Sequence, residues 1–464
     1  MSRPSAEREL RSEERAQEDL RPMSTALLTD RYELTMLQAA LADGTAQRRC
    51  VFEVFTRRLP AGRRYGVVAG TGRLLEAIAD FRFADAELDW LRSAGVVDDA
   101  TLTFLADYRF TGSISGYAEG ELFFPGSPVL VVDGTFAEAV VLETLALSIL
   151  NYDSAVASAA SRMTWAANGR PCLEMGSRRA HEDAAVAAAR AAVVAGFAGT
   201  SNLEAGRRYG LDTIGTAAHA FTLLHDDEES AFASQVASAG PGTTLLVDTY
   251  DVTRGVELAV AAAGTGLGAV RLDSGDLPTL AREVREQLDA LGATGTRIVV
   301  SSDLDEHAIA ALAVAPVDSY GVGTSVVTGS GAPTCGMVYK LVLREGADGE
   351  LAAVAKVSAG AKSSVGGRKV AGRRLEGGIA TEEVVLTSPD ADVPVVDPVA
   401  ASGDVLRPLH VPLVRDGEVG EAWTGSEGVQ RARERHSASL AELPRAAKRL
   451  SAGEPALPTE VVVV

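Results

Sequence analysis

Cysteine is scarce in this sequence of 464 residues. Its three cysteines, Cys50, Cys172 and Cys335, lie far apart and form no Cys-x-x-Cys pair. This argues against a disulfide framework and against a cysteine-ligated zinc site. We therefore expect a protein of a reducing compartment, with a cytoplasmic location.

Net positive charge is also lacking. The chain carries 63 acidic and 44 basic residues, a formal net charge of -19 and a pI near 4.9. Proteins that bind nucleic-acid backbones usually present a basic face, so we expect no nucleic-acid partner. The overall field cannot attract a polyanionic small substrate either. A phosphate site would have to be locally basic, or built from backbone N–H groups and a metal ion.

Long hydrophobic runs are missing as well. The most apolar windows, such as residues 184–198, are interrupted by Arg190 or by glycine. None reaches the roughly 18 uninterrupted apolar residues that span a bilayer, so we expect no membrane partner. Residues 1–22 alternate arginine with acidic residues and lack the apolar stretch of a secretory signal. We predict that they form a disordered, charged tail.

The length fits two to four domains of roughly 100 to 200 residues each. Residues 23–128 mix helical and strand patterns and predict an N-terminal α+β domain. Its expected elements are a helix at 27–42 that Thr29 or Asp30 could cap, strands at 50–55 and 65–69, a helix at 72–81 and a glycine-rich hairpin at 110–125.

Residues 129–343 follow a different pattern. Short apolar runs end in polar or glycine-rich clusters and precede alanine-rich helical stretches; they lie at 173–175, 196–198, 212–214, 245–247, 270–272, 298–300 and 320–322. Parallel strands that are buried on both faces have this continuous apolar character. Seven βα units rather than eight predict an irregular α/β barrel, with the polar clusters converging on one face.

Residues 344–464 predict a small C-terminal region with short strands. The expected terminal helix at 431–450 contains Pro444, which would kink or divide it.

His219 is the first candidate for chemistry. It stands three residues after the hydroxyl of Thr216, at the end of a predicted strand. In that position an imidazole could act as a base, a nucleophile or a phosphate acceptor. The simpler alternative is a structural histidine that donates to a backbone carbonyl, and on this feature alone it is the more common case.

Three further clusters are candidates for anion binding. Residues 271–276 and 321–325 couple a strand end to small residues whose N–H groups can cradle phosphate oxygens. Asp273 and Asp276 could hold Mg²⁺ or bind ribose hydroxyls, although Asp-Ser-Gly is also a common turn sequence. Arg178 and Arg179 could bind a carboxylate or phosphate through a guanidinium fork, with a surface ion pair as the alternative.

Six motifs together resemble the nicotinate phosphoribosyltransferases. They are TDRYELTM (29–36), FEVFTRRLP (52–60), GTSN (199–202), GTAAH (215–219), RLDSGDL (271–277) and GTSVVT (323–328), the last followed by VYKL (338–341). The match runs in order from about residue 27 to 343. TDRYELTM and GTSVVT with VYKL are the specific motifs. The stretch 356–370 is similar to a C-terminal element of the family but lacks its usual proline before the glycine.

The resemblance implies an irregular α/β barrel of the type II phosphoribosyltransferase kind with an N-terminal α+β domain. It also implies a homodimer with shared active sites, in which Tyr32 stacks on the pyridine ring across the subunit boundary. Further implied roles are nicotinate contacts for Thr216 and Arg271, and phosphoribosyl pyrophosphate contacts for Gly323, Thr324 and Ser274. To these we add Arg178 as a candidate clamp for a carboxylate or pyrophosphate.

The implied reaction joins nicotinate to phosphoribosyl pyrophosphate and forms nicotinate mononucleotide for NAD salvage. ATP is the implied co-substrate, hydrolysed through a phosphohistidine at His219, so that the enzyme would be classed as a ligase. Asp273 and Mg²⁺ would stabilise the separated charges as pyrophosphate leaves. The resemblance assigns no metal ligands.

Three alternatives compete with this interpretation. A nicotinamide phosphoribosyltransferase would need an acceptor for the amide NH₂, whereas Arg271 and Thr216 favour an acid. A quinolinate phosphoribosyltransferase fits poorly, because it uses a shorter chain without ATP or a phosphorylated histidine. A non-catalytic nucleotide-binding relative would be expected to have lost some of His219, Arg271, Asp273 and Thr324, yet all are present.

Overall fold

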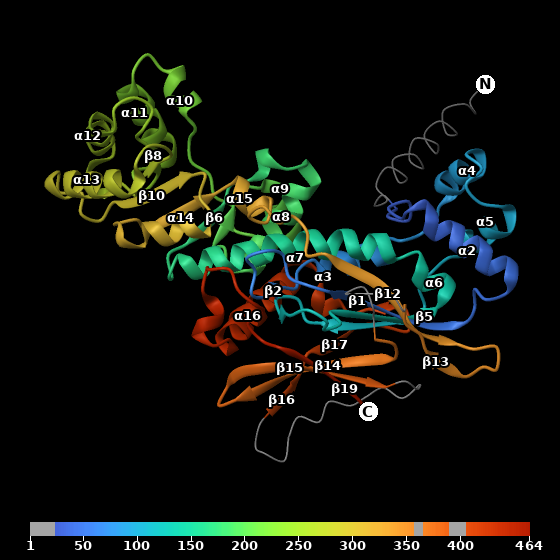
Figure 1. The fold of residues 1–464 in the computed structure, drawn as a ribbon. Coiled ribbons are helices and arrows are strands. Elements are labelled where there is room, and N and C mark those ends of the chain that lie inside the picture. Colours follow the sequence, from blue (N-terminus) through green and yellow to red (C-terminus); the bar gives the residue numbers. More distant parts are fainter. Residues whose placement is uncertain (1–23, 357–364, 389–404) are drawn as a thin grey trace, which may run out of the picture.

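The computed structural model describes residues 24–356, 365–388 and 405–464. The predicted tail at 1–22 and part of the stretch 356–370 lie outside these residues. A long helix, α7 (Glu143–Ala166), runs through the centre of the molecule. Figure 1 shows the parallel strands and their helices towards one end of α7, and α2, α4 and α5 towards the other.

The N-terminal part is built on a seven-stranded antiparallel sheet. Its order is β13 (Leu351–Ala353), β12 (Met337–Glu345), β1 (Arg49–Thr56), β5 (Leu130–Thr135), β3 (Ser113–Tyr117), β17 (His410–Arg415) and β18 (Glu418–Val419). Strand β1 is buried on both faces except at Arg49. The charge of Glu53 within it is compensated by Lys369, whose Nζ lies 2.8 Å from Glu53 Oε2.

Strand pairing crosses the predicted domain boundaries at 128 and 343. Strands β5 and β12 both pair with β1, and β17 from the C-terminal region pairs with β3. Around this sheet lie α2 (Arg31–Asp43), α3 (Thr71–Ala79), α4 (Asp85–Ser93), α5 (Asp99–Ala106) and α6 (Phe136–Val140). The predicted helices at 27–42 and 72–81 and the strand at 50–55 are confirmed with shifted ends.

The predicted hairpin at 110–125 is wrong. Strand β3 pairs with β5 and β17, while β4 (Leu122–Phe123) pairs with β2 (Gly66–Val67). Strand β2 is the part of the predicted strand at 65–69 that forms. The residues between β3 and β4 contain two buried carboxylates with partners elsewhere. Glu119 pairs with Arg190 of the barrel, and Glu121 pairs with Arg373 of the C-terminal sheet. Strands β3 and β4 therefore belong to two different sheets, and the segment between them is anchored by these ion pairs.

The predicted irregular α/β barrel is confirmed. Six parallel strands form a sheet in the order β7 (Gly199–Thr200), β6 (Cys172–Glu174), β11 (Ser319–Val322), β10 (Arg297–Ser302), β9 (Ala269–Leu272) and β8 (Thr244–Leu246). Thr213 adds a single parallel bridge to Thr200, so the seventh predicted run is present without a full strand. The seven segments follow one another around the barrel in chain order. Among the described residues, no strand pairing joins Thr213 to β8, and the barrel is open there.

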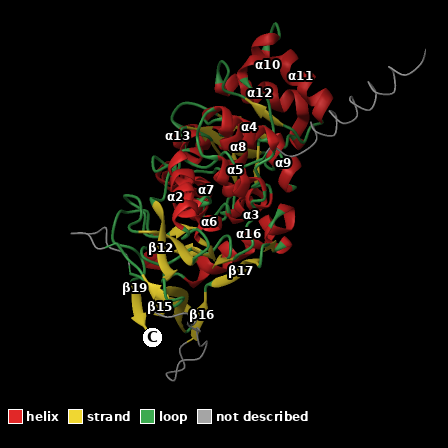
Figure 2. Ribbon diagram, turned by 90° about the vertical axis from the view of Figure 1, so that its right-hand side faces the viewer, coloured by secondary structure: helices red, strands yellow, loops and turns green. Residues whose placement is uncertain are grey.

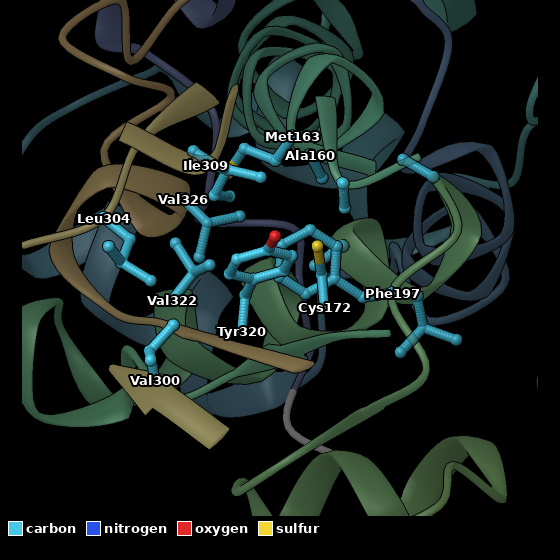
Figure 3. Close-up of a cluster of buried hydrophobic side chains, with 14 of the residues drawn as sticks. Ala160, Met163, Cys172, Phe197, Val300, Leu304, Ile309, Tyr320, Val322 and Val326 are labelled. Atoms are coloured by element: carbon cyan, nitrogen blue, oxygen red, sulfur yellow. The ribbon is translucent and has the colours of Figure 1, made fainter. Parts of the chain in front are cut away.

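The barrel strands alternate with short helices. These are α8 (Glu182–Val194), α9 (Leu203–Tyr209), α10 (His219–Leu224), α11 (Glu228–Ala239), α12 (Val252–Ala263), α13 (Leu277–Ala290), α14 (Glu306–Ala311) and α15 (Thr324–Val327), with 3₁₀ turns at Ser177–Arg179, Gly264–Gly266 and Leu312–Val314. Figure 3 shows part of the core, where Cys172, Val300, Tyr320 and Val322 of the strands meet Met163 of α7. Burial of such side chains stabilises the fold by roughly 25 cal/mol per Å² of apolar surface.

Helices α6 and α7 together form an apolar stretch of the chain. Among the described residues, Phe136–Ala166 is one helical stretch that is long and apolar enough to cross a membrane by length and composition. Of the most apolar 18 residues of this stretch, 67% are buried inside the protein. Helix α7 packs against α3, α8 and α14, as the core helix of a globular fold does.

The C-terminal region forms a four-stranded sheet in the order β16 (Val405–Pro408), β14 (Arg368–Glu376), β15 (Ile379–Ser388) and β19 (Thr459–Val463). The last valines form β19, which pairs in parallel with β15. A 3₁₀ turn at Glu421–Trp423 precedes helix α16 (Gly425–Glu442), and Pro444 separates that helix from a second 3₁₀ turn at Arg445–Lys448. The prediction that Pro444 interrupts the terminal helix is confirmed.

Candidate active site

The polar clusters that follow the barrel strands converge at one edge of the parallel sheet. Pairing aligns Arg271 of β9 with Leu246 of β8 and with Val299 of β10, and it aligns Val322 of β11 with Ser302. Because neighbouring strands are parallel, the residues that follow their carboxyl ends face a common space. This edge holds most of the candidate residues.

Arg271 is at the centre of a hydrogen-bond network. Its Nε donates to Ser301 Oγ at 2.7 Å, its Nη1 to Thr216 Oγ1 at 3.2 Å and its Nη2 to Asp273 Oδ1 at 2.8 Å. The structure therefore brings Thr216, Arg271 and Asp273 together, although 55 residues separate Thr216 from Arg271. A guanidinium carries five N–H groups, so two remain for a ligand.

Asp273 has one engaged and one available carboxylate oxygen. Its Oδ1 accepts hydrogen bonds from Arg271 and from the hydroxyl of Ser301. Burial raises the pKa of Asp273, but the hydrogen bonds from Ser301 and Arg271 and the charge of Arg271 outweigh it and lower the pKa. Its Oδ2 faces His219 Nε2 at 3.9 Å. The side chain is therefore a fixed anion at neutral pH.

Asp248 is a site residue that sequence reasoning missed. Its side chain is 2% exposed, and its Oδ2 accepts hydrogen bonds from the Asp273 N–H and the Ser274 hydroxyl, both at 2.8 Å. Its Oδ1 is buried, has no hydrogen-bond partner in the part of the chain that the structure describes, and lies 3.9 Å from His219 Nε2. A buried carboxylate oxygen without a partner is costly and points to a missing ligand.

His219 begins helix α10 and is held from two sides. Its Nδ1 lies 3.1 Å from Thr249 Oγ1, and its Nε2 faces the free oxygens of Asp248 and Asp273. The side chain is 39% exposed, so a ligand can reach it. If His219 were a purely structural histidine, its ring would form a hydrogen bond to a backbone carbonyl. His225 at the end of α10 makes such a bond, to Phe221 O at 2.9 Å, whereas His219 bonds to no backbone carbonyl of the described residues.

The remaining barrel candidates follow β6 and β11. Gly323 precedes α15, and Thr324 is exposed at its first position. Arg178 is exposed in the 3₁₀ turn Ser177–Arg179, and among the described residues no ion pair engages its guanidinium. This turn packs against α15. Sequence reasoning assigned no role to Asn202. Its side-chain amide donates to Ser177 Oγ at 3.1 Å and so supports the turn.

Tyr32 does not join this network within one chain. It lies near the start of α2, with 46% of the residue exposed. Helix α2 is far from α10 in both Figure 1 and Figure 2. Partial burial and the nearby carboxylates of Glu143 and Glu33 raise the pKa of Tyr32 to about 12, so its phenol stays neutral.

The motif at 52–60 contributes to a separate cavity of about 800 Å³. Arg57 and Arg58 line it together with residues 59–61 and 334–336. The Nε of Arg57 is buried and has no hydrogen-bond partner among residues 24–356, 365–388 and 405–464. Sequence reasoning named no site residue in this motif, although an arginine pair in an acidic chain was the available signal.

Comparisons with known proteins give relatives along most of the chain. The family model for the nicotinate phosphoribosyltransferase N-terminal domain matches residues 27–151. A nicotinate phosphoribosyltransferase of Mycobacterium tuberculosis is 58% identical over 445 residues, which cover 94% of this chain and 95% of that protein. The Bacillus subtilis nicotinate phosphoribosyltransferase is 38% identical over 344 residues, which cover 72% of this chain and 70% of that protein.

A solved structure extends the similarity to the whole fold. The crystal structure of human nicotinic acid phosphoribosyltransferase matches with a TM-score of 0.78 at 27% identity, covering 94% of this chain and 97% of that chain. The structure of the nicotinate-nucleotide pyrophosphorylase from Pyrococcus furiosus matches with a TM-score of 0.71 at 25% identity, covering 89% and 95%.

Proposed function

The chain belongs to the nicotinate phosphoribosyltransferase family, and we propose that it joins nicotinate to phosphoribosyl pyrophosphate with ATP hydrolysis coupled through a phosphohistidine at His219. The observation that carries the proposal is the network at the carboxyl ends of β8–β10. It places the histidine against two carboxylates and beside an arginine with free N–H groups. The product, nicotinate mononucleotide, would serve NAD salvage in the cytoplasm.

Nicotinate would bind with its carboxylate on Arg271 and Thr216. The two N–H groups that Arg271 keeps free, and the hydroxyl of Thr216, suit an anionic oxygen pair. Because Tyr32 is exposed and distant from this network in its own chain, we propose that it stacks on the pyridine ring in the site of a second copy. The protein would then be a homodimer with shared active sites.

In the transfer step, the pyridine nitrogen attacks the anomeric carbon while the bond to the pyrophosphate oxygen breaks. Positive charge develops on the ribose ring, and negative charge develops on the leaving pyrophosphate. The fixed carboxylate of Asp273 would stabilise the positive end. Gly323, Thr324 and Ser274 would bind the phosphoribosyl group, and Arg178 would clamp the pyrophosphate or the carboxylate.

The same carboxylates fit a Mg²⁺ ion that is completed by substrate. Asp248 Oδ1 is buried without a partner, and Asp273 Oδ2 faces the same histidine. Mg²⁺ is usually bound by one or two carboxylates plus substrate phosphates, so a third protein ligand is not needed. Among the described residues, no group of three or more His, Cys, Asp or Glu forms a closed metal cage. When bound, Mg²⁺ would neutralise charge on the phosphates.

His219 would take the γ-phosphoryl group of ATP on Nε2. Thr249 occupies Nδ1 and leaves Nε2 directed to the two carboxylates. The new N–P bond forms as the bond to the ADP oxygen breaks, and water later hydrolyses the phosphohistidine to inorganic phosphate. This cycle would couple the hydrolysis of ATP to the binding of phosphoribosyl pyrophosphate, the ribosyl donor.

The test is product analysis with Mg²⁺, phosphoribosyl pyrophosphate and either nicotinate or nicotinamide, each with and without ATP. We expect nicotinate mononucleotide, formed faster with ATP. In His219→Ala, ATP hydrolysis and acid-labile phosphorylation should vanish while a slow ATP-independent transfer stays; His225→Ala is the matched control with normal coupling. ATP stimulation in His219→Ala would refute the phosphohistidine. Product from nicotinamide alone would favour the amide-using relative, and no product would favour a non-catalytic protein.

A further inference from the structure

The first turn of helix α7 lacks a cap of its own. Its N-cap residue is Leu142, whose side chain cannot accept a hydrogen bond. The first N–H groups of a helix have no partner within the helix and need an external acceptor. Here the acceptor is Glu33 on α2, which lies 111 residues earlier in the chain. Glu33 Oε1 accepts from the Thr144 N–H at 2.9 Å and from the Thr144 hydroxyl at 2.5 Å.

The other oxygen of Glu33 is also engaged. The hydroxyl of Thr29 donates to Glu33 Oε2, and it lies 3.1 Å from the carbonyl oxygen of Val141, just before α7. Glu33 is fully buried, so its carboxylate depends on these partners. Burial raises the pKa of the Glu33 carboxyl, and the hydrogen bonds from Thr144 and Thr29 oppose that rise. Thr29, Glu33 and Thr144 therefore form a clamp that fixes the start of α2 to the start of α7.

Tyr32 is the residue next to Glu33. Its hydroxyl lies against Glu143 and Thr144, which are the first two residues of α7. Nearly half of Tyr32 nevertheless stays exposed, at 46%. The clamp thus holds the phenol end of the side chain against α7 and leaves part of the residue open to solvent. A ring held in this way has little conformational freedom left to lose on binding.

We propose that Glu33, through its hydrogen bonds to Thr144 and Thr29, is the positioning residue that presents Tyr32 to the pyridine ring of nicotinate bound by a second copy of this chain. The inference rests on the proposed stacking role of Tyr32. It assigns a function to Thr29 and Glu33, two further polar positions of the motif at 29–36. Thr29 and Glu33 touch no substrate and act only through Tyr32.

The test is a mutant cycle on the purified full-length protein, with KM for nicotinate and kcat measured separately. In Glu33→Ala the KM for nicotinate should rise about two- to tenfold, which corresponds to ordering one freed side chain. The value of kcat and the KM for phosphoribosyl pyrophosphate should change less than twofold. Glu33→Gln keeps an acceptor for Thr144 and should restore most of the affinity.

The cycle with Tyr32→Ala separates positioning from a general structural role. If Glu33 acts through Tyr32, Glu33→Ala should have no further effect on the nicotinate KM in the Tyr32→Ala background. Glu87→Ala is the matched control, because Glu87 accepts the Ala84 N–H at the start of α4, away from Tyr32. It should leave the KM unchanged. If Glu33→Ala does not fold, Thr144→Val, which removes one donor, should show a smaller effect in the same direction.

The outcomes distinguish this proposal from the one on which it rests. A wild-type nicotinate KM in both Glu33→Ala and Thr144→Val, or an effect that adds to that of Tyr32→Ala, would overturn the positioning role. An unchanged KM in Tyr32→Ala itself would overturn the stacking role and the positioning role with it. Formation of nicotinate mononucleotide by the wild-type protein is judged separately from both.

Discussion

Replacing Glu306 by glutamine removes a negative charge that two buried arginines share. Glu306 Oε1 lies 2.9 Å from Arg63 Nη1 and 2.9 Å from Arg162 Nε, and all three side chains are at most 6% exposed. Its Oε2 accepts from the Ser330 hydroxyl at 2.7 Å. One carboxylate thus connects the N-terminal part, helix α7 and the loop that follows α15.

Two physical arguments give the same size for the loss of unfolding free energy in Glu306→Gln. Burial raises the pKa of Glu306, but the Ser330 hydroxyl, the charge of Arg63 and the hydrogen bond from Arg162 outweigh it and lower the pKa to about 2 from an ordinary 4.5. At about 1.36 kcal/mol for each pKa unit, this corresponds to about 3 kcal/mol of stability at neutral pH. Breaking a buried ion pair on one side costs about 3 to 5 kcal/mol by mutation. We expect a loss of about 3 kcal/mol.

The pH dependence has a definite sign. Because the pKa of Glu306 is lower in the folded protein, its contribution to stability is complete above about pH 4.5 and is lost as the pH falls towards 2. Burial lowers the pKa of Arg63, but an arginine stays protonated at all these pH values, so the carboxylate determines the pH dependence. The difference between wild type and Glu306→Gln should therefore be constant from pH 7 to 5 and shrink below that.

The assay is urea unfolding of both proteins, followed by circular dichroism at pH 7, 5 and 3.5. Glu204→Gln is the control, because Glu204 pairs with Arg207 on the surface, and its midpoint should not change. A loss below about 1 kcal/mol at pH 7 for Glu306→Gln, or a loss that does not decrease with acid, would show that the carboxylate is not ionised and shared as described.

Three substitutions test the barrel site. Arg271→Lys keeps the charge but loses the planar fork, so the KM for nicotinate should rise about 10- to 100-fold; an unchanged KM in steady-state assays would exclude Arg271 as the carboxylate partner. Asp248→Asn removes the charge that faces His219, and acid-labile phosphorylation from labelled ATP should slow by about tenfold or more, whereas a wild-type rate would leave Asp248 without that role. Thr249→Val frees Nδ1 of His219 and should slow phosphorylation by less than about tenfold; no change would mean that Thr249 does not orient the ring.

The barrel could be predicted from sequence because its signals are local. Each strand is a short apolar run with its own polar end. In a parallel βα barrel, strands that follow one another in the chain lie next to one another in space. That is why Thr216, His219, Arg271 and Asp273, chosen separately or by resemblance, lie in one network. The N-terminal sheet could not be predicted in this way. Strand β12 pairs with β1 although Arg344 lies 294 residues after its partner Cys50, and no local pattern specifies such a partner.

Asp248 and Ser301 were missed for a different reason. An aspartate after a strand is also a common helix cap, and Asp251, three residues later, does cap α12 by accepting the Arg254 N–H. A serine in the same position carries even less information. Only the structure shows that Asp248 Oδ1 has no partner and that Ser301 bridges Arg271 and Asp273. Which polar residue of a strand-end cluster is functional depends on contacts between separate βα units.

Helix α7 connects the hydrogen bonds of Glu33 to the buried ion pairs of Glu306. Its 24 residues span about 36 Å at 1.5 Å per residue. Its first turn is held by Glu33 beside Tyr32, while Arg162 near its other end bonds to Glu306. Glu33→Ala and Glu306→Gln therefore disturb opposite ends of one helix. If the two ends act independently, Glu33→Ala should raise the KM for nicotinate and Glu306→Gln should leave that KM unchanged; a raised nicotinate KM in Glu306→Gln would mean that the helix transmits the disturbance from one end to the other.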